Sequence, residues 1–298
     1  MPVFGRVLTA MATPLHADGT LDLDGAQRLA VHLVEHGSDG VFVAGTTGES
    51  PTLDHDETLA LLRAVVEAVG GRAMVVAGCG KNDTAATVRL VREATGAGVD
   101  GVVLVTPYYN KPPQRGLEAH FAVAAAATHL PVMLYNIPSR TACEIAPDTL
   151  LRIAEAAPNV RAVKDAVGDF PASAWVASRA PESFEVYAGD DVSLLPLLAV
   201  GGVGVVSVAG HLVGEQLARM VDVFPKDPGE ARALHWRLLP LFRALFVETN
   251  PVPLKAALRL VGLPAGPVRP PLAEAADATV AAVRQALAAV DVGGDGSA

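Results

Sequence analysis

The chain has 298 residues, and its 51% hydrophobic and 18% charged content is typical of a globular protein in water. The formal net charge of −9 argues against nucleic acid as a partner, so an anionic substrate would need cations placed locally. There is no apolar run of about 18 residues, we expect no signal peptide, and two cysteines are too few for a disulfide framework, which together predict a cytoplasmic protein without a membrane partner.

A repeat of a helix stop, a tight turn and an apolar strand organises the chain. Residues 37–46 and 98–107 both follow this pattern. The other predicted strands lie at 7–13, 73–77, 131–135, 160–164, 185–188 and 204–208. Their centres are roughly 20 to 33 residues apart, which is the spacing of βα units.

The segments between the strands have helical periodicity. In the first, Asp22 or Asp24 is the expected N-cap and Gly37 the C-cap, and another helix begins after Asn82 and Asp83. Strands that are apolar on both faces and alternate with helices indicate a parallel sheet. Eight such units favour a closed (β/α)8 TIM barrel over an open doubly wound sheet, whose dinucleotide-binding glycines are missing after the first strand.

We expect the barrel to occupy residues 1–224. A cluster of helix breakers at 225–229 follows it, and the periodicity then predicts three helices at about 229–247, 252–262 and 272–290. These helices form an appended segment, 225–298, rather than an independent domain. A disordered tail is expected from Gly293.

Lys164 is the candidate nucleophile. It ends an apolar strand, and alternation places Val160, Ala162 and Lys164 on one face. An apolar pocket lowers the pKa of a lysine and makes its amine nucleophilic towards a carbonyl. Taken alone, a lysine at a strand end more often reaches into water, but the other four lysines lie beside turn, proline or helix signals.

Polar groups gather where barrel enzymes place their active sites, at the carboxyl ends of the strands. They include a glycine-rich turn with Thr46 and Thr47, the tyrosines Tyr108 and Tyr109, and the segment from Tyr135 to Arg140. Singly, such features are ordinary capping turns or packed aromatics.

Together these groups fit a keto acid. Lys164 would form an iminium with the ketone, Tyr135 would be the general acid and base, and Thr46 could bridge it to a second tyrosine. The turn at Thr46 and Thr47 would hold the carboxylate, and Arg140 could clamp the carboxylate of a second substrate.

Other signals favour structural roles. Asp190 and Asp191 follow a strand at a helix start, so we expect helix capping rather than a metal pair. No histidine stands at metal-ligand spacing from His55, and no Walker or Gly-x-Ser-x-Gly motif is present, so neither a metal nor a cofactor is expected. A non-enzymatic barrel that binds a metabolite would have lost the lysine or the tyrosines, which are retained.

Five motifs in order resemble the dihydrodipicolinate synthase family over about residues 5–290. They are Gly45-Thr46-Thr47-Gly48-Glu49-Ser50, Tyr108-Tyr109-Asn110, Tyr135-Asn136-Ile137-Pro138-Ser139-Arg140-Thr141, Val163-Lys164-Asp165 and Asn250-Pro251-Val252-Pro253-Leu254-Lys255. The resemblance implies condensation of pyruvate with L-aspartate 4-semialdehyde to 4-hydroxy-tetrahydrodipicolinate, in lysine and diaminopimelate biosynthesis.

The same resemblance implies a role for each matching residue. Lys164 would form the Schiff base, and Tyr135, Thr46 and Tyr109 the proton relay, with Tyr109 supplied by a neighbouring subunit of a homotetramer arranged as a dimer of dimers. Thr47 would bind the carboxylate of pyruvate and Arg140 that of the semialdehyde, and Gly189 and Val206 would supply backbone around the pocket.

Two questions stay open from the sequence. N-acetylneuraminate lyase and the sugar-acid aldolases share the barrel and the lysine, although Thr47, the tyrosine pair and Arg140 favour the synthase. Ser50, His55, Asn82 and Tyr108 match the family's feedback site for lysine, whereas Thr58 and Ala86 stand where sensitive members often carry His and Glu. We therefore predict weak or absent inhibition by lysine.

Overall fold

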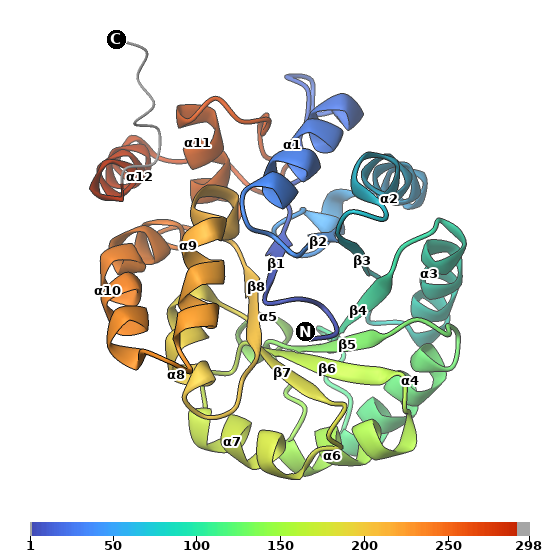
Figure 1. Cartoon of the computed structure of the whole chain (residues 1–298). Coiled ribbons are helices and arrows are strands. Elements are labelled where there is room, and N and C mark those ends of the chain that lie inside the picture. Colours follow the sequence, from blue (N-terminus) through green and yellow to red (C-terminus); the bar gives the residue numbers. More distant parts are fainter. Residues whose placement is uncertain (1, 291–298) are drawn as a thin grey trace.

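Eight parallel strands form a closed barrel in the computed structural model, which describes residues 2–290 (Figure 1). Each strand pairs with its neighbours in sequence, and β8 pairs back onto β1 through Val206 and Leu8. The predicted TIM barrel is therefore confirmed. The strands are β1 (Val7–Ala10), β2 (Gly40–Val43), β3 (Met74–Gly78), β4 (Gly101–Val105), β5 (Val132–Asn136), β6 (Val160–Asp165), β7 (Glu185–Ala188) and β8 (Gly204–Ser207).

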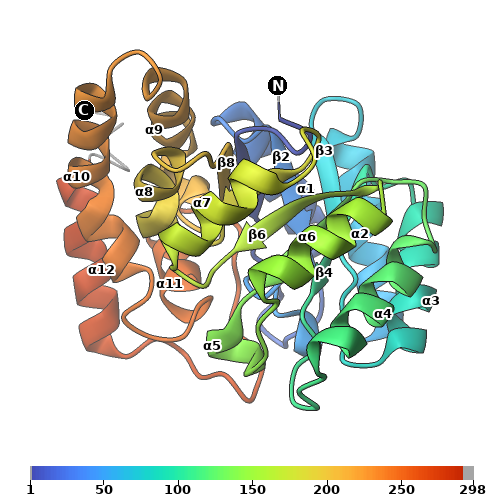
Figure 2. The ribbon, with the colours of Figure 1, turned by 90° about the horizontal axis from the view of Figure 1, so that it is seen from below.

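Helices follow the strands and surround the barrel (Figures 1 and 2). Asp22, not Asp24, caps the first of them by accepting a hydrogen bond from the Gly25 N–H, and the third begins after Asn82 and Asp83, as predicted, with Asp83 as its N-cap. The helices are α1 (Leu23–Glu35), α2 (His55–Val69), α3 (Thr84–Gly96), α4 (Gln114–Ala125), α5 (Pro138–Thr141), α6 (Pro147–Ala156), α7 (Phe170–Arg179), α8 (Leu194–Leu198) and α9 (Gly210–Val223), with 3₁₀ turns η1 (Ser50–Thr52) and η2 (Asp191–Ser193).

The strands bury both faces, as a parallel sheet covered by helices requires. One apolar cluster lies between the strands and the helices, and a second fills the barrel interior. The interior is closed at the amino ends of the strands. There the Phe4 N–H donates to the Tyr187 hydroxyl at 3.2 Å, and that hydroxyl donates to Glu185 at 2.8 Å.

Strand β6 departs from the predicted alternation. Val132 pairs with Val160, but the next pair is Met133 with Ala162, so Arg161 is an extra residue on β6. The bulge reverses the faces, and Val160 packs outward against the helices while Ala162 lies in the interior cluster. The prediction that Val160 shares the face of Lys164 is therefore wrong.

Three helices follow the barrel, α10 (Pro228–Ala244), α11 (Val252–Leu260) and α12 (Asp277–Ala289), and they lie together on one side beside α9 (Figures 1 and 2). The third begins five residues later than predicted. Residues 265–272, which we call the C-terminal strap, connect α11 towards α12 and contact the barrel, where the Leu15 N–H donates to the Ala265 carbonyl. The tail predicted from Gly293 lies outside the described residues.

Within residues 2–290, no helix is both long and apolar enough to cross a membrane. The division of the chain into a barrel and an appended segment remains a prediction.

Candidate active site

Lys164 lies in the barrel interior near the end of β6 and is 4% exposed. Its Nζ is 4.1 Å from the centre of the Tyr135 ring and 5.5 Å from that of Phe42. Burial lowers the pKa of Lys164 to about 7; the carboxylates of Asp191 and Asp190 oppose this shift, and Arg140 reinforces it. A large fraction of the amine is therefore neutral near pH 7 and able to attack a carbonyl.

Lys255 is buried even more completely than Lys164, but its amine is occupied. Its Nζ lies 2.5 Å from Oε1 of Glu49 and donates to the Pro267 carbonyl at 2.7 Å. Among residues 2–290, no carboxylate lies within ion-pairing distance of Lys164. Of the two enclosed lysines, Lys164 is thus the one whose amine is available for chemistry.

Tyr135 on β5 is opposite Lys164 in the strand register. Burial raises the pKa of Tyr135 to about 12, against the effects of Arg140 and of a hydrogen bond with the Thr46 side chain. The Thr106 hydroxyl donates to the Tyr135 carbonyl at 2.9 Å and fixes the strand end. The phenol therefore stays protonated near neutral pH and can donate a proton.

A cavity of about 330 Å³ lies at this end of the barrel. Thr46 and Arg140 both line it, together with Lys81, Asn250 and residues of the C-terminal strap. Arg140 lies on α5, and its Nη2 donates to the Asn250 carbonyl at 3.4 Å. Because Thr46 is also the hydrogen-bond neighbour of Tyr135, the cavity leads towards the Tyr135–Lys164 pair.

The predicted carboxylate-binding turn is tightly held. The Glu49 N–H donates to the Thr46 carbonyl at 3.1 Å, and the buried Thr47 hydroxyl accepts from the Asn250 amide at 2.9 Å. Gly48 fits here because a Cβ would lie only 3.1 Å from the Met11 carbonyl oxygen.

Three further predicted site residues do not line this cavity. Tyr109 is 90% exposed and has a φ of 73°. The Gly189 N–H donates to the carbonyl of Asp165, the residue after Lys164, and Val206 packs in the same interior cluster as Tyr135.

Asp190 and Asp191 accept hydrogen bonds from different parts of the chain. Asp190 caps η2 by accepting from the Val192 N–H at 2.9 Å, as predicted. The prediction fails for Asp191, which is fully buried and accepts from the Ala209 N–H at 3.0 Å and from the Ser207 hydroxyl. Burial raises the pKa of Asp191 to about 6. In the part of the chain that the structure describes, no group of three or more His, Cys, Asp or Glu side chains could hold a metal ion.

Asn250, Glu49 and Asp191 were not predicted as site residues. The first two belong to the motifs that carry the family resemblance, so their place in those motifs was the available signal. Their partners are distant in sequence, with Asn250 and Thr47 lying 203 residues apart. Periodicity and spacing give no information about such contacts.

Comparison with known proteins gives one consistent result. Residues 3–290 match the model of the "Dihydrodipicolinate synthetase family". A curated relative from Moorella thermoacetica, named 4-hydroxy-tetrahydrodipicolinate synthase, is 58% identical over 90% of this chain and 92% of its own length. The relative of the same name from Symbiobacterium thermophilum is 52% identical over 98% of this chain and all of its own.

Solved structures agree with these relatives. The structure described as dihydrodipicolinate synthase from Cyanidioschyzon merolae with lysine bound has a TM-score of 0.96 and 45% identity, covering 98% of this chain and 99% of its own. A structure described as a monomeric dihydrodipicolinate synthase variant has a TM-score of 0.94 and 38% identity, covering 97% and 98%.

Proposed function

This chain belongs to the dihydrodipicolinate synthetase family, and we propose that it condenses pyruvate with L-aspartate 4-semialdehyde through a Schiff base on Lys164. It is an enzyme, a lyase of the 4-hydroxy-tetrahydrodipicolinate synthase type. The observation that carries the proposed mechanism is the enclosed Lys164 amine, whose pKa of about 7 leaves it reactive beside Tyr135.

The first half of the reaction activates pyruvate. The Lys164 amine attacks the ketone carbon, water leaves, and an iminium forms whose positive charge accepts electrons from the neighbouring methyl group. The methyl group loses a proton to give an enamine. In this proposal Tyr135 and Thr46, which share a hydrogen bond, move protons in these steps, and the Thr47 hydroxyl holds the carboxylate.

In the second half, the enamine carbon attacks the aldehyde carbon of the semialdehyde, and the aldehyde oxygen takes up a proton to become a hydroxyl. The amino group of the semialdehyde then attacks the iminium carbon, closing a six-membered ring and releasing Lys164 as a free amine. Arg140 lines the cavity, which supports its proposed role of holding the second carboxylate.

A second copy of the chain completes the proposed site. Tyr109 is exposed, and its positive φ is unfavourable for a bulky residue, a strain typical of functional positions. We place this tyrosine in the relay of a neighbouring subunit, in a homotetramer arranged as a dimer of dimers. Gly189 and Val206 would contribute backbone around the bound pyruvate, and the cytoplasm is the expected location.

Borohydride reduction with pyruvate tests the proposal. The reagent would reduce the iminium to a stable secondary amine, and peptide mapping should place the adduct on Lys164. Lys164→Ala should abolish trapping and turnover, whereas Lys226→Met, which removes an exposed lysine, should change neither. Trapping elsewhere, or turnover that survives Lys164→Ala, would contradict the mechanism.

The second substrate needs a separate measurement. The pyruvate adduct before reduction should react with L-aspartate 4-semialdehyde and not with N-acetylmannosamine or sugar-acid aldehydes. Faster reaction with one of the sugars would indicate N-acetylneuraminate lyase or sugar-acid aldolase activity instead.

Lysine should inhibit weakly or not at all. Thr58 is buried and its hydroxyl donates to the Asp54 carbonyl, so its hydroxyl proton is engaged by the backbone, and Ala86 provides no carboxylate. A missing carboxylate removes a charge-assisted hydrogen bond of about 1.5–3 kcal/mol. Calorimetric titration with L-lysine should give little heat, and Ala86→Glu should strengthen binding. A submillimolar inhibition constant for the unchanged chain would refute the prediction.

A further inference from the structure

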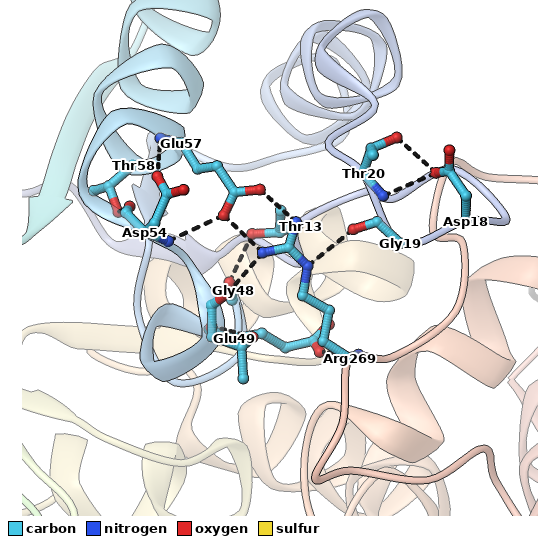
Figure 3. A network of polar contacts seen from close by, with 11 residues as sticks. Thr13, Asp18, Gly19, Thr20, Gly48, Glu49, Asp54, Glu57, Thr58 and Arg269 are labelled. Carbon is cyan, nitrogen blue, oxygen red and sulfur yellow. Dashed lines mark hydrogen bonds and ion pairs between the residues drawn. The ribbon is translucent and has the colours of Figure 1, made fainter.

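The turn formed by residues 46–49 is anchored from three directions. From the loop after β1, the Thr13 hydroxyl donates to the Gly48 carbonyl at 2.7 Å (Figure 3). The other two anchors come from beyond the barrel, since Asn250 contacts Thr47 and Lys255 contacts Glu49. The segment appended to the barrel therefore holds the turn that carries two of the proposed site residues.

The anchor at Glu49 is an enclosed ion pair. The side chains of Lys255 and Glu49 are 0% and 2% exposed, with Nζ and Oε1 2.5 Å apart. The backbone N–H of Arg269 donates to the other carboxylate oxygen at 2.8 Å. Taking both charges out of water offsets much of their attraction, so such a pair adds little net stability and mainly fixes geometry.

Arg269 ties the C-terminal strap down beside this pair. Its guanidinium donates to both oxygens of Glu57, to the Thr52 carbonyl and to the Gly19 carbonyl (Figure 3). These acceptors belong to the loops after β1 and β2 and to the start of α2. The strap thus has a fixed place from which its backbone can hold Glu49.

The hydrogen bond from Asn250 fixes the direction in which the Thr47 hydroxyl points its own hydrogen. Nδ2 of Asn250 can only donate, so the Thr47 oxygen accepts at 2.9 Å and its own hydrogen is free for another acceptor. Asn250 is 5% exposed, and its Oδ1 has no hydrogen-bond partner among residues 2–290. Burying an unpaired amide oxygen is unfavourable, which indicates that this side chain serves orientation rather than stability.

We propose that Asn250 and the Glu49–Lys255 pair are positioning residues that aim the Thr47 hydroxyl at the carboxylate of the keto acid. The segment after the barrel thereby sets the affinity for the first substrate. This inference rests on the proposed function, because it takes Thr47 as the group that binds the carboxylate of pyruvate.

Asn250→Asp reverses the hydrogen bond at nearly constant shape. The carboxylate would accept the Thr47 hydrogen, turning it away from the substrate, and would add a negative charge near an anion. Asn250→Ala leaves the hydroxyl free to rotate. The readout is the pyruvate concentration that gives half-maximal borohydride trapping on Lys164. It should rise a few-fold in Asn250→Ala and at least about tenfold further in Asn250→Asp, with trapping at saturation near the wild-type level.

Two controls separate orientation from folding. Asn159→Asp makes the same chemical change where the amide donates to the carbonyls of Ala125, Thr128 and Leu130 at the start of β6, and should leave half-saturation unchanged. In a Thr47→Val background, which has no hydroxyl to turn, Asn250→Asp should raise half-saturation by a clearly smaller factor than in the wild-type background.

The ion pair is tested by Glu49→Gln combined with Lys255→Met, which leaves no unpaired charge. Half-saturation should rise about tenfold in the double variant although its melting temperature stays near that of the wild type. Wild-type half-saturation in this double variant and in Asn250→Asp would overturn the inference and leave the proposed function intact. Absence of any pyruvate adduct in the wild type would overturn the proposed function, and this inference with it.

Discussion

The environment of a single amine decides the chemistry proposed for this barrel. Burial and Arg140 push the pKa of Lys164 down, whereas Asp191 and Asp190 push it up, and the balance lies at about 7. The aspartates thus keep the lysine from becoming so weakly basic that the iminium would be hard to form. The nearby Tyr135 keeps its proton because burial raises its pKa to about 12.

The pH dependence of the first step should follow this balance. Below pH 7 Lys164 is protonated, so kcat/KM for pyruvate should rise tenfold per pH unit and level off above about pH 7. Asp190→Asn removes a charge that raises the pKa of Lys164 but can still cap the Val192 N–H. The rising limb should therefore move to lower pH in this variant. A limb that stays in place or moves to higher pH would contradict the assignment of Lys164.

At the scale of the elements, the C-terminal strap depends on Arg269. Arg269→Met keeps the apolar stem but loses the two-point contact with Glu57, and we expect a loss of about 1–3 kcal/mol in the free energy of unfolding. Arg269 also holds the pKa of Glu57 below its usual value. This contribution is present above the ordinary carboxyl pKa and is lost as pH falls, so the two proteins should converge in acid.

Urea unfolding at pH 7 and in acid measures both effects. Arg152→Met is the matched control, because its ion pair with Glu118 is more exposed and should contribute about 1 kcal/mol or less. Equal losses in the two variants would mean that the strap is not held by Arg269.

The sequence predicted the barrel because buried parallel strands are continuous apolar runs bounded by glycine turns. Strand ends were less certain: the first strand was predicted to reach Thr13 but ends at Ala10, since apolar residues continue past the last strand hydrogen bonds. The bulge at Arg161 was not predictable, because alternation assumes one residue per step.

The grouping of candidate side chains was predictable where they lie at the ends of neighbouring strands, as Lys164 and Tyr135 do. It was not predictable where a side chain is defined by a distant partner. Asp191 follows a strand like a helix cap, yet it braces the turn after β8, 18 residues away. Lys255 looked like an ordinary helix lysine and is instead fully enclosed against Glu49.

At the scale of the whole molecule, the proposed site needs two copies of the chain. Lys164→Met removes the proposed nucleophile and Tyr109→Phe the proposed relay hydroxyl, and each variant alone should lose most activity. Mixed subunits should regain about a quarter of wild-type activity, because one site in four then combines an intact Lys164 with a partner's intact tyrosine. No recovery in a mixture shown to contain hybrid oligomers would place both residues in the same subunit.

The net charge of −9 repels anionic substrates over the whole surface, so cations at the cavity matter. Lys81 lines the cavity with Arg140. We expect Lys81→Gln to lower kcat/KM for pyruvate several-fold at low ionic strength and less at high salt. Lys226→Gln makes the same charge change on an exposed residue after α9 and should have little effect. A salt-independent loss would indicate a direct contact instead of attraction over distance.

Phe4 and Tyr187 are fully buried at the amino ends of the strands, so we expect both substrates to reach Lys164 through the cavity at the carboxyl ends. Both substrates, the released water and the product would then pass through that cavity, and the Lys164 amine would lie beyond its inner end. Pyruvate would bind first, and the water released when the iminium forms would leave before the semialdehyde enters. A high concentration of the semialdehyde should therefore exclude pyruvate from the cavity and inhibit the reaction. The shape of the barrel would thus impose the order in which the two substrates bind.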